Sequence, residues 1–278
     1  MQSKGIILSG STGYLGSQLS KILNPKYLLI CNKNSFVDKD TVLFDVNLKE
    51  VKNITTTYSN FIIIHLATYF SKNINDNQLI EEANLSFGQK LLKFSEKINV
   101  KKFIYTNTMF SFYNDKNIRN LYYTKTKMQF SKILLNHSQS NKYLVDEIYL
   151  DNTFGGIDNR NKIIPNIVKS IISGKDSPVL NKDVYINLLY YQDVINRIIY
   201  SIENDIQDNS AFININSVNL DSIYNYLNFY REKGVDKKEL LKYKSNKYTK
   251  EMPMINYYNL KLSDIEKYLV SYLNSFSN

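Results

Sequence analysis

Short apolar runs alternate with longer amphipathic stretches through the first half of the chain. The runs are rich in Val, Ile and aromatic residues, which is typical of buried strands, and turn signals or helical patterns separate them. We expect strands at residues 6–9, 27–31, 42–44, 61–66, 103–106 and 144–150. Strands that alternate with helices predict βαβ units, and so a doubly wound parallel (Rossmann) sheet of the α/β class.

Two helical patterns lie among the later strands. From Ile80 to Ile98 apolar residues recur every three or four positions, which places them on one face of a helix. A second helix is expected from about Leu121 to Asn136. The first pattern therefore predicts one helix with a single buried face.

After residue 150 the alternation is less regular. The stretch "IIPNIVKSIISGK" predicts a helix that ends at Gly174, residues 184–204 predict a strand and then a helix, and "AFININ" (211–216) predicts another strand. Two amphipathic stretches follow at 220–233 and 262–276. We expect a first domain of residues 1–152 with a returning segment at about 184–210, and a smaller C-terminal lobe of residues 153–183 and 211–278.

Composition narrows the class of protein. Hydrophobic residues make up 43% and charged residues 22%, as in ordinary folded domains. The single cysteine, Cys31, excludes an intrachain disulfide, and no Cys or His group has zinc-ligand spacing, so we expect no metal and a reducing cytoplasm. No apolar run has the length of a signal peptide core or a membrane span, and we expect no membrane partner.

The formal net charge of +9 raises the question of nucleic acid as a partner. The lysines are scattered along the chain, with the densest stretch at 237–250. Charge that is scattered in this way is more typical of a solvated basic surface, which attracts small anions, than of a nucleic-acid interface.

The stretch "GSTGYLG" follows the first expected strand. Gly10, Gly13 and Gly16 suit a tight turn, close approach of the backbone to a pyrophosphate and close packing of the next helix on the sheet. The amides at the start of that helix are an anion site. The loop therefore predicts dinucleotide binding by Gly10, Thr12, Gly13, Tyr14, Leu15 and Gly16.

The end of the second strand bears on the choice of cofactor. An acidic residue there selects NAD, whereas a basic neighbourhood accepts the 2′-phosphate of NADP. Asn32 and Lys33 occupy this position, which favours NADP. The alternative is that Asn32 bonds a ribose hydroxyl of NAD while Lys33 lies on the surface.

Tyr123 and Lys127 are four residues apart on the second expected helix, so they share a face. An ammonium group near a phenol stabilises the phenolate, and we expect Lys127 to lower the pKa of Tyr123 toward neutrality. The same spacing recurs at Tyr243 and Tyr257, so the place of the pair in the fold has to identify it.

The chain resembles the extended short-chain dehydrogenase/reductase family of nucleotide-sugar epimerases, dehydratases and ketoreductases. The matching stretches occur in the family's order over about 200 residues, and only the last 60 or so match poorly. They are "GSTGYLG", Asp45 in "VLFDVN", "HLAT" (65–68), Asn84 in "EEANLSFGQKLL", "FIYTNTMF" (103–110), "YTKTK" (123–127), "DNTFGGIDNRNKIIP" (151–165) and "LLYYQDVINRII" (188–199).

The resemblance implies roles for particular residues. Thr108, with Thr106 as the fallback, would hydrogen-bond the reacting oxygen, Tyr123 would be the acid/base, and Lys127 would bind the nicotinamide ribose. Asp45, Val46, Leu66, Ala67 and Thr68 would contact the cofactor, and Asn152, Arg160 and Lys162 would bind the nucleotide-sugar substrate in the smaller lobe. The family also implies a homodimer formed through residues 77–98 and 121–136.

Departures from the family pattern point to one reaction. The resemblance implies an Asp-Glu pair after the catalytic hydroxyl residue in 4,6-dehydratases, but Met109 and Phe110 stand there. We therefore expect NADPH-dependent reduction of a nucleotide-linked 4-keto-6-deoxy sugar. An NAD-dependent 4-epimerase and a non-catalytic dinucleotide-binding regulator are the alternatives; the Thr108, Tyr123 and Lys127 set speaks against the regulator.

Overall fold

The computed structural model describes residues 5–23, 28–32, 42–44, 60–156, 158, 160–214, 216–245, 248–249, 251–255 and 264–276. The chain forms two compact units. Unit 1 comprises Met1–Tyr149, Ile198–Ala211 and Thr249–Met254, and unit 2 comprises Leu150–Arg197, Phe212–Tyr248 and Ile255–Asn278. The domain bounds expected from the sequence stay a prediction. The first segment of unit 1 ends at Tyr149, residues 184–197 belong to unit 2, and Thr249–Met254 is a third segment of unit 1.

Unit 1 is built on a sheet with the strand order β3-β2-β1-β4-β5-β6-β10-β13. The pairs from β3 through β5 are parallel. This order matches the doubly wound Rossmann arrangement and confirms the predicted α/β class. The strands are β1 Gly5–Ser9, β2 Leu28–Asn32, β3 Val42–Phe44, β4 Phe61–His65, β5 Val100–Thr108, β6 Leu144–Leu150, β10 Asp208–Phe212 and β13 Met254–Ile255.

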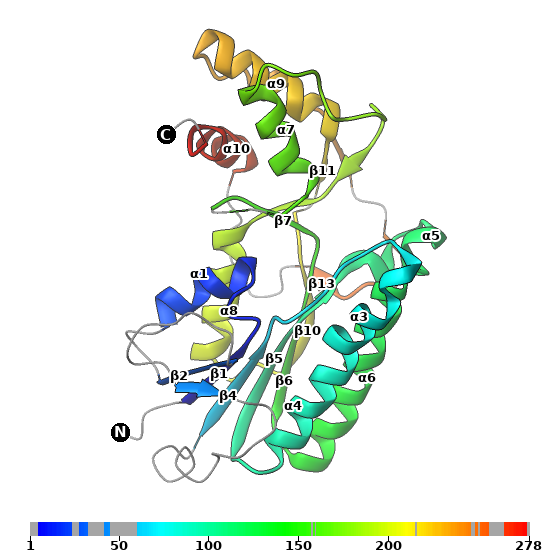
Figure 1. Cartoon of the computed structure of the whole chain (residues 1–278), viewed down its shortest axis with the longest axis vertical. Helices are drawn as coiled ribbons and strands as arrows, with labels where there is room; N and C mark the ends of the chain where they lie inside the picture. Colours follow the sequence, from blue (N-terminus) through cyan, green and yellow to red (C-terminus); the bar gives the residue numbers. More distant parts are fainter. Residues whose placement is uncertain are drawn as a thin grey trace. The chain divides into compact units, whose positions relative to one another are not determined.

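Helices cover both faces of this sheet (Figure 1), with α1 on one face and α4 and α6 on the other. The helical pattern that starts at Ile80 is interrupted, because a π-helical turn lies between two α-helices. The helix expected from Ile80 onward is present to Ser95, and its π-helical turn was not part of the expectation. The elements are α1 Tyr14–Leu23, η1 Ile74–Asp76, α3 Asn77–Glu81, η2 Glu82–Ser86 (the π turn), α4 Phe87–Ser95, η3 Met109–Phe112, α5 Lys116–Arg119 and α6 Tyr122–Asn141.

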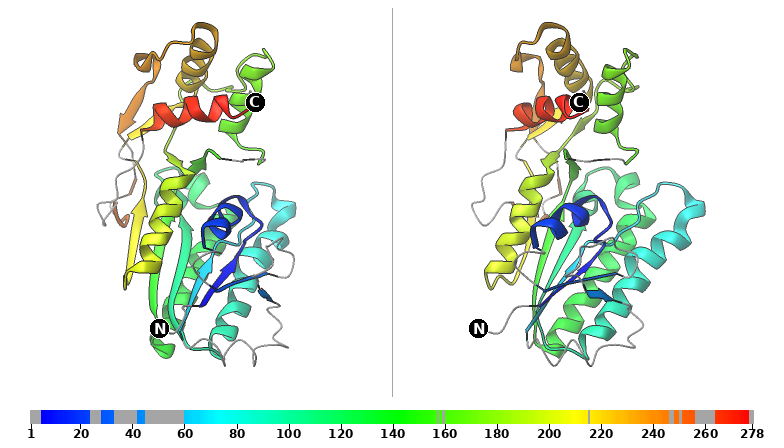
Figure 2. Two further views of the ribbon diagram at one scale, coloured as in Figure 1. Left: turned by 90° about the vertical axis from the view of Figure 1, so that its left-hand side faces the viewer. Right: turned by 60° about the vertical axis from the view of Figure 1, so that its left-hand side comes forward.

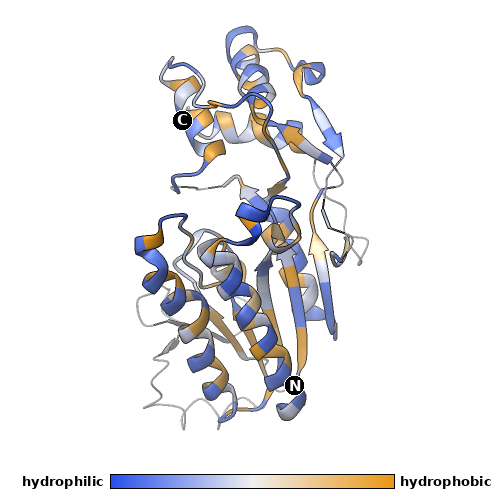
Figure 3. Ribbon diagram, turned by 90° about the vertical axis from the view of Figure 1, so that its right-hand side faces the viewer, coloured by the Kyte–Doolittle hydropathy of each residue, from blue (hydrophilic) through white to orange (hydrophobic). Residues whose placement is uncertain are grey.

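The core of unit 1 follows from the alternation of β5. Phe103 and Tyr105 point to one face of the sheet, where they pack with Phe94 of α4 and Phe130 of α6. In Figure 3 these helices carry alternating hydrophobic and hydrophilic bands, as expected of helices with one buried face. Lys102 belongs to the opposite face and is buried as well.

Unit 2 contains two small sheets and several helices (Figure 2). β7 and β9 pair in parallel, and β11 pairs antiparallel with β8 and β12. The predicted strand at 211–216 is wrong in its bounds, because β10 ends at Phe212 and β11 begins at Asn216. The elements are β7 Asn152–Phe154, α7 Ile163–Ile172, β8 Tyr185–Ile186, β9 Leu188–Tyr190, α8 Tyr191–Glu203 (which continues into unit 1), β11 Asn216–Asn219, α9 Leu220–Lys233, η4 Lys238–Leu240, β12 Tyr243–Ser245 and α10 Ile265–Asn274.

Helix ends in unit 2 follow their local sequence. Gly174 lies just beyond the end of α7 with φ +66°, a conformation that favours glycine, in line with the predicted stop. Asn219 is the N-cap residue of α9, and its side chain accepts a hydrogen bond from the amide of Ser222. In the described part of the chain no helix combines the length and apolar character needed to cross a bilayer.

Candidate active site

The glycine loop connects β1 to α1 at the carboxyl edge of the unit 1 sheet. Gly10 has φ +77°, and a Cβ atom there would lie 2.6 Å from the Ala67 nitrogen. A Cβ atom on Gly16 would lie 2.0 Å from the Gly10 carbonyl oxygen, while the Gly13 amide donates to that oxygen at 2.9 Å. Any side chain at Gly10 or Gly16 would therefore force the loop apart.

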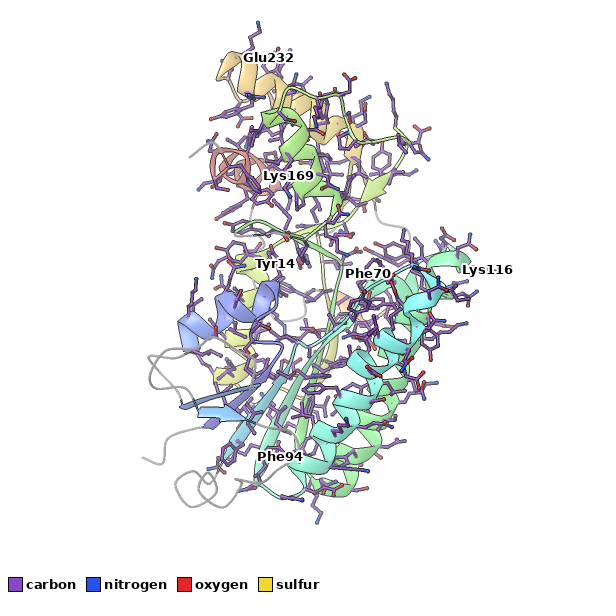
Figure 4. The ribbon with its side chains drawn as sticks, viewed as in Figure 1. Tyr14, Phe70, Phe94, Lys116, Lys169 and Glu232 are labelled. Atoms are coloured by element: carbon purple, nitrogen blue, oxygen red, sulfur yellow. The ribbon has the colours of Figure 1, made fainter. Side chains whose placement is uncertain are left out.

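This loop fits the pyrophosphate of a dinucleotide. The backbone turns tightly out of β1, and the ten-residue helix α1 begins at Tyr14, labelled in Figure 4, with its positive dipole end at the loop. Thr12 is exposed and Leu15 half-buried. The loop after β4 lies alongside, since the Leu66 amide donates to the Ser9 carbonyl at 3.1 Å.

Other residues predicted to bind the cofactor are less completely described. Leu66 is buried, Ala67 is half-buried and Thr68 is exposed. Asn32 is the last residue of β2. Lys33, Asp45 and Val46 lie outside the described residues.

Thr108 ends β5 and forms hydrogen bonds through its side chain and its backbone amide. Its Oγ1 atom accepts a hydrogen bond from the Phe110 amide at 3.3 Å and caps η3. Its own amide donates to Asn107 Oδ1 at 2.7 Å, and Asn107 Nδ2 donates to Glu147 Oε1 on β6 at 2.7 Å. Accepting from Phe110 leaves the single Thr108 hydroxyl hydrogen for donation, and the Tyr123 hydroxyl is its hydrogen-bond partner in the structure.

Tyr123 lies in the first turn of α6 among aromatic rings. Its ring meets Phe70 edge-on with centroids 5.0 Å apart, and Phe110 at 6.2 Å. Burial raises the pKa of Tyr123, while the hydroxyls of Thr68 and Thr108 pull this pKa down less strongly. The direction is opposite to the expected lowering by Lys127, because loss of hydration outweighs the neighbouring groups.

Lys127 is buried one turn further along α6. Its Nζ donates to the Thr106 carbonyl at 2.6 Å and lies 4.3 Å from the centre of the Tyr105 ring. Burial lowers the pKa of Lys127 to about 7, and the nearby Glu147 carboxylate acts in the opposite direction. The ammonium is thus turned toward β5 and β6, and its binding of a nicotinamide ribose stays a prediction.

The structure places Tyr123 beside the Thr108 hydroxyl, and Lys127, one turn further along α6, donates to the Thr106 carbonyl. The sequence interpretation missed that Asn107 and Glu147 support Thr108, and that the Thr68 hydroxyl acts on Tyr123. A signal existed for Glu147, because an acidic residue inside the apolar strand "LVDEIYL" needs a buried partner.

The predicted substrate-binding residues lie in unit 2 with partners of their own. Asn152 Nδ2 donates to Asp151 Oδ1 at 2.6 Å and to the Asn187 carbonyl at 3.2 Å. Arg160 binds Asp158 through two hydrogen bonds of 2.7 and 2.8 Å. The buried Asp158 therefore offsets the positive charge expected from Arg160, and Lys162, half-buried, precedes α7.

A family model matches this chain. The model describes the NAD dependent epimerase/dehydratase family and aligns with residues 6–215, well over half of the chain. The chain belongs to the NAD-dependent epimerase/dehydratase family. The resemblance seen in the sequence is confirmed, and the protein is an NAD(P)-dependent enzyme.

Relatives of known activity are distant members of this family. CDP-abequose synthase of Salmonella muenchen is 22% identical over 201 residues, which are 69% of this chain and 68% of that protein. The CDP-abequose synthase of Yersinia pseudotuberculosis is 23% identical over 214 residues, which are 72% of this chain and 74% of that protein.

Solved structures share the fold over almost the whole chain. A UDP-N-acetylglucosamine 4-epimerase from Methanobrevibacter ruminantium has a TM-score of 0.77 at 16% identity and covers 100% of this chain and 99% of its own. A UDP-glucose 4-epimerase from Thermotoga maritima has a TM-score of 0.76 at 15% identity and covers 98% of both chains. At these identities the likeness establishes the fold of the epimerase/dehydratase family alone.

Proposed function

We propose that the protein is an NADPH-dependent reductase of a nucleotide-linked 4-keto-6-deoxy sugar. The observation that carries this proposal is the setting of Tyr123. The aromatic neighbours and the hydroxyls of Thr68 and Thr108 surround a phenol whose pKa is raised by burial, so the phenol holds its proton at neutral pH. A proton donor is the group that reduction of a carbonyl requires.

The cofactor, when bound, supplies the hydride that reaches the carbonyl carbon. Tyr123 gives its proton to the oxygen as negative charge develops there, and the Thr108 hydroxyl donates a hydrogen bond to the same oxygen. One ketone, one NADPH and one proton thus give one alcohol and one NADP⁺. The one proton consumed comes from the solvent and restores the Tyr123 phenol.

The residues after Thr108 favour reduction over elimination. Met109 is fully buried and Phe110 is half-buried beside Tyr123, so neither position offers the second acid or base that removal of water requires. The names of the distant relatives support a nucleotide-linked sugar as substrate, and a CDP-linked sugar is the first to test.

The choice of NADPH rests on Asn32 and Lys33 in place of an acid after the second strand. Contact of Asn152, Arg160 and Lys162 with the diphosphate, a homodimer and a cytoplasmic location belong to the same proposal. Comparing kcat/KM for NADPH and NADH tests the preference for NADPH. An equal or higher value for NADH would contradict this preference.

The test of the activity combines the protein with NADPH and CDP-, dTDP- or GDP-linked 4-keto-6-deoxyhexoses and follows absorbance at 340 nm. We expect stoichiometric oxidation, with kcat/KM lowered by roughly 10²- to 10⁴-fold in Tyr123→Phe. Tyr122→Phe is the matched control, because the neighbouring Tyr122 hydroxyl bonds Glu81 and has no role in the proposed reaction.

Three outcomes separate the alternatives. Sugar conversion without net loss of NADPH would identify an epimerase and contradict the proposal. Full activity of Tyr123→Phe would remove the tyrosine from the mechanism. Binding of NADPH with no turnover of any ketosugar would favour a non-catalytic role.

A further inference from the structure

Aromatic side chains lie beside the Tyr123 ring within unit 1: Phe70 and Phe110 are its direct neighbours, and Tyr113 packs against Phe110. Phe70 follows β4, and Phe110 and Tyr113 come from η3 and the residue after it. The ring centroids of Phe70 and Phe110 are 6.1 Å apart, and those of Phe110 and Tyr113 are 5.3 Å apart. We call Phe70, Phe110 and Tyr113 the aromatic enclosure; each is half-buried, so part of each ring is open to a ligand.

The segment that carries Phe70 is fixed by one buried amide. Asn84, in the π turn η2, accepts hydrogen bonds from the Thr68 hydroxyl and the Tyr69 amide, both at 2.9 Å. Asn84 Nδ2 donates to the Tyr69 carbonyl at 3.0 Å and to Thr126 Oγ1 at 3.4 Å. Thr126 in turn donates to the Tyr123 carbonyl at 3.0 Å.

These bonds connect the loop after β4 to the turn of α6 that carries Tyr123. Asn84 uses both lone pairs and both N–H groups, so its orientation is fully determined. Phe110 is held separately by the hydrogen bond from its amide to Thr108 Oγ1. Phe70 and Phe110 are therefore set in place before a ligand arrives. Figure 4 labels Phe70 near α5, at the edge of the unit 1 sheet where β4 ends.

The enclosure determines which sugar atoms can lie beside the reacting carbonyl. Tyr123 and Thr108 both act on the carbonyl oxygen, so the carbons flanking that carbonyl must pass close to these rings. A hydroxyl on a flanking substituent would lose its water and find ring edges and faces in exchange. A methyl or methylene group there loses nothing of this kind and gains contact with the rings.

We propose that Phe70 and Phe110 select a sugar that is deoxygenated next to its 4-keto group, with the 6-methyl group as the recognised feature. This inference rests on the proposed function and adds the residues that determine specificity. An apolar pocket discriminates against one added hydroxyl by roughly 10- to 100-fold, which sets the size of the expected preference.

The test uses pairs of inhibitors that differ in a single oxygen. For the nucleotide that supports turnover, the inhibition constant of the nucleotide-linked 6-deoxyhexose is compared with that of the hexose bearing a 6-hydroxyl. We expect the wild type to favour the deoxy compound by about tenfold or more. Phe70→Gln and Phe110→Gln should bring this ratio close to one, while Phe70→Leu and Phe110→Leu should keep it within about twofold of the wild type.

The comparison of Gln with Leu separates specificity from folding, because a general loss of structure weakens both inhibitors alike. Phe229→Leu in α9 is the control, since its ring lies beside Lys237 and is not part of the enclosure. A wild-type ratio near one, or a ratio that the Gln variants leave unchanged, overturns the inference.

Failure of the proposed function would look different. If no ketosugar is reduced, calorimetric binding of the CDP-linked 6-deoxyhexose and of the CDP-linked hexose bearing a 6-hydroxyl to protein loaded with NADPH measures the ratio. If no ketosugar is turned over but the deoxy sugar still binds more tightly, the proposed reductase activity is contradicted and the role of the aromatic enclosure is supported. If ketosugars are reduced but the ratio is one, the role of the enclosure is contradicted and the reductase activity is supported.

Discussion

His65 ends β4 inside the aromatic core of unit 1. Its ring stacks on Tyr105 at 5.6 Å and meets Phe130 edge-on at 5.1 Å, and Nδ1 shares a 2.6 Å hydrogen bond with the Ser9 hydroxyl. Nε2 is buried and has no partner among the described residues. Burial, together with the nearby Lys127, lowers the pKa of His65 to about 3, so the folded protein holds this ring neutral.

This histidine makes stability fall in acid. In the unfolded chain His65 gains a proton near pH 6.5, whereas in the folded chain it stays neutral down to about pH 3. Between these values the unfolded state therefore binds one proton more than the folded state. Stability from this residue is complete above pH 6.5 and declines below it by about 1.4 kcal/mol per pH unit. Urea unfolding of the wild type and His65→Gln at pH 5, 6 and 7.5 should show a shallower decline in the variant.

The control for that measurement is His137→Gln, which removes the other histidine of the chain. His137 is close to the surface, where it bonds Glu96 at 3.0 Å and Tyr143 at 2.8 Å. The slope of this variant is the reference against which the slope of His65→Gln is compared. Parallel slopes for the wild type and His65→Gln would show that His65 does not resist protonation in the fold.

The candidate site residues could be predicted where a sequence motif contains them. Their pKa values, which depend on tertiary packing, could not. Tyr123, Lys127 and Thr108 were singled out from their order along the chain; in the structure Tyr123 lies beside the Thr108 hydroxyl, and Lys127 donates to the Thr106 carbonyl. The direction of the Tyr123 pKa was not predictable, because it depends on rings such as Phe70, which is more than 50 positions away in sequence. The spacing of four residues places Lys127 one turn from Tyr123, but it does not predict the burial that raises the pKa of Tyr123.

At the level of elements, β5 joins α8 through a buried ammonium group. Lys102 alternates with Phe103 and therefore faces the side of the sheet opposite to α4 and α6. Its Nζ donates to the Ser201 carbonyl at 2.8 Å and to the Asn204 carbonyl, both at the C-terminal end of α8. A cation at this end satisfies carbonyls that the helix leaves open and complements the helix dipole.

Lys102→Met tests this connection, because methionine keeps most of the side-chain length and removes the donor. Two carbonyls lose a charged partner, and we expect the free energy of unfolding to fall by about 1–3 kcal/mol. Lys101→Met is the matched control on the same strand, since Lys101 is exposed and should change stability by less than about 0.5 kcal/mol. Equal urea midpoints for the two variants would contradict the role given to Lys102.

Element types were more predictable than element details. Each of the six strands expected in the first half is present as β1 to β6, because apolar runs of β-branched residues identify buried strands. The π turn at Glu82–Ser86 was not foreseen, since an apolar repeat of three and four residues tolerates one extra residue. The turn places Asn84 where its amide can bond residues 68 and 69, a tertiary reason absent from the local pattern.

For the whole molecule, the doubly wound sheet could be predicted from the alternation of strand and helix patterns, whereas the set of segments that make up unit 1 could not. The stretch "TKEMPM" contains no pattern that predicts Thr249–Met254 to be part of unit 1. In the structure the Thr249 amide donates to the Phe112 carbonyl at 2.8 Å. Sequence periodicity needs several residues of repeat to be detected, and β13 spans only Met254–Ile255. Contacts between distant segments decide such short strands.

The three segments of unit 1 predict how it folds. A chain that ends at Leu150 contains β1 to β6 and lacks β10 and β13, so β6 becomes an edge strand of mostly buried residues. Open strand edges with apolar side chains pair with other chains and aggregate. Lys102 would also lose the carbonyls of Ser201 and Asn204 while remaining in the sheet.

We therefore expect residues 1–150 produced alone to be insoluble or without cooperative unfolding, and residues 151–278 supplied in the same cells to restore a soluble complex that binds NADPH. Soluble yield, far-ultraviolet circular dichroism and NADPH fluorescence measure these outcomes. Residues 151–278 carrying Ala211→Pro are the control, because Ala211 is buried in β10 and proline removes a donor from the sheet. If residues 1–150 fold cooperatively and bind NADPH alone, the returning segments do not complete unit 1, and the Rossmann half of this enzyme is an autonomous domain.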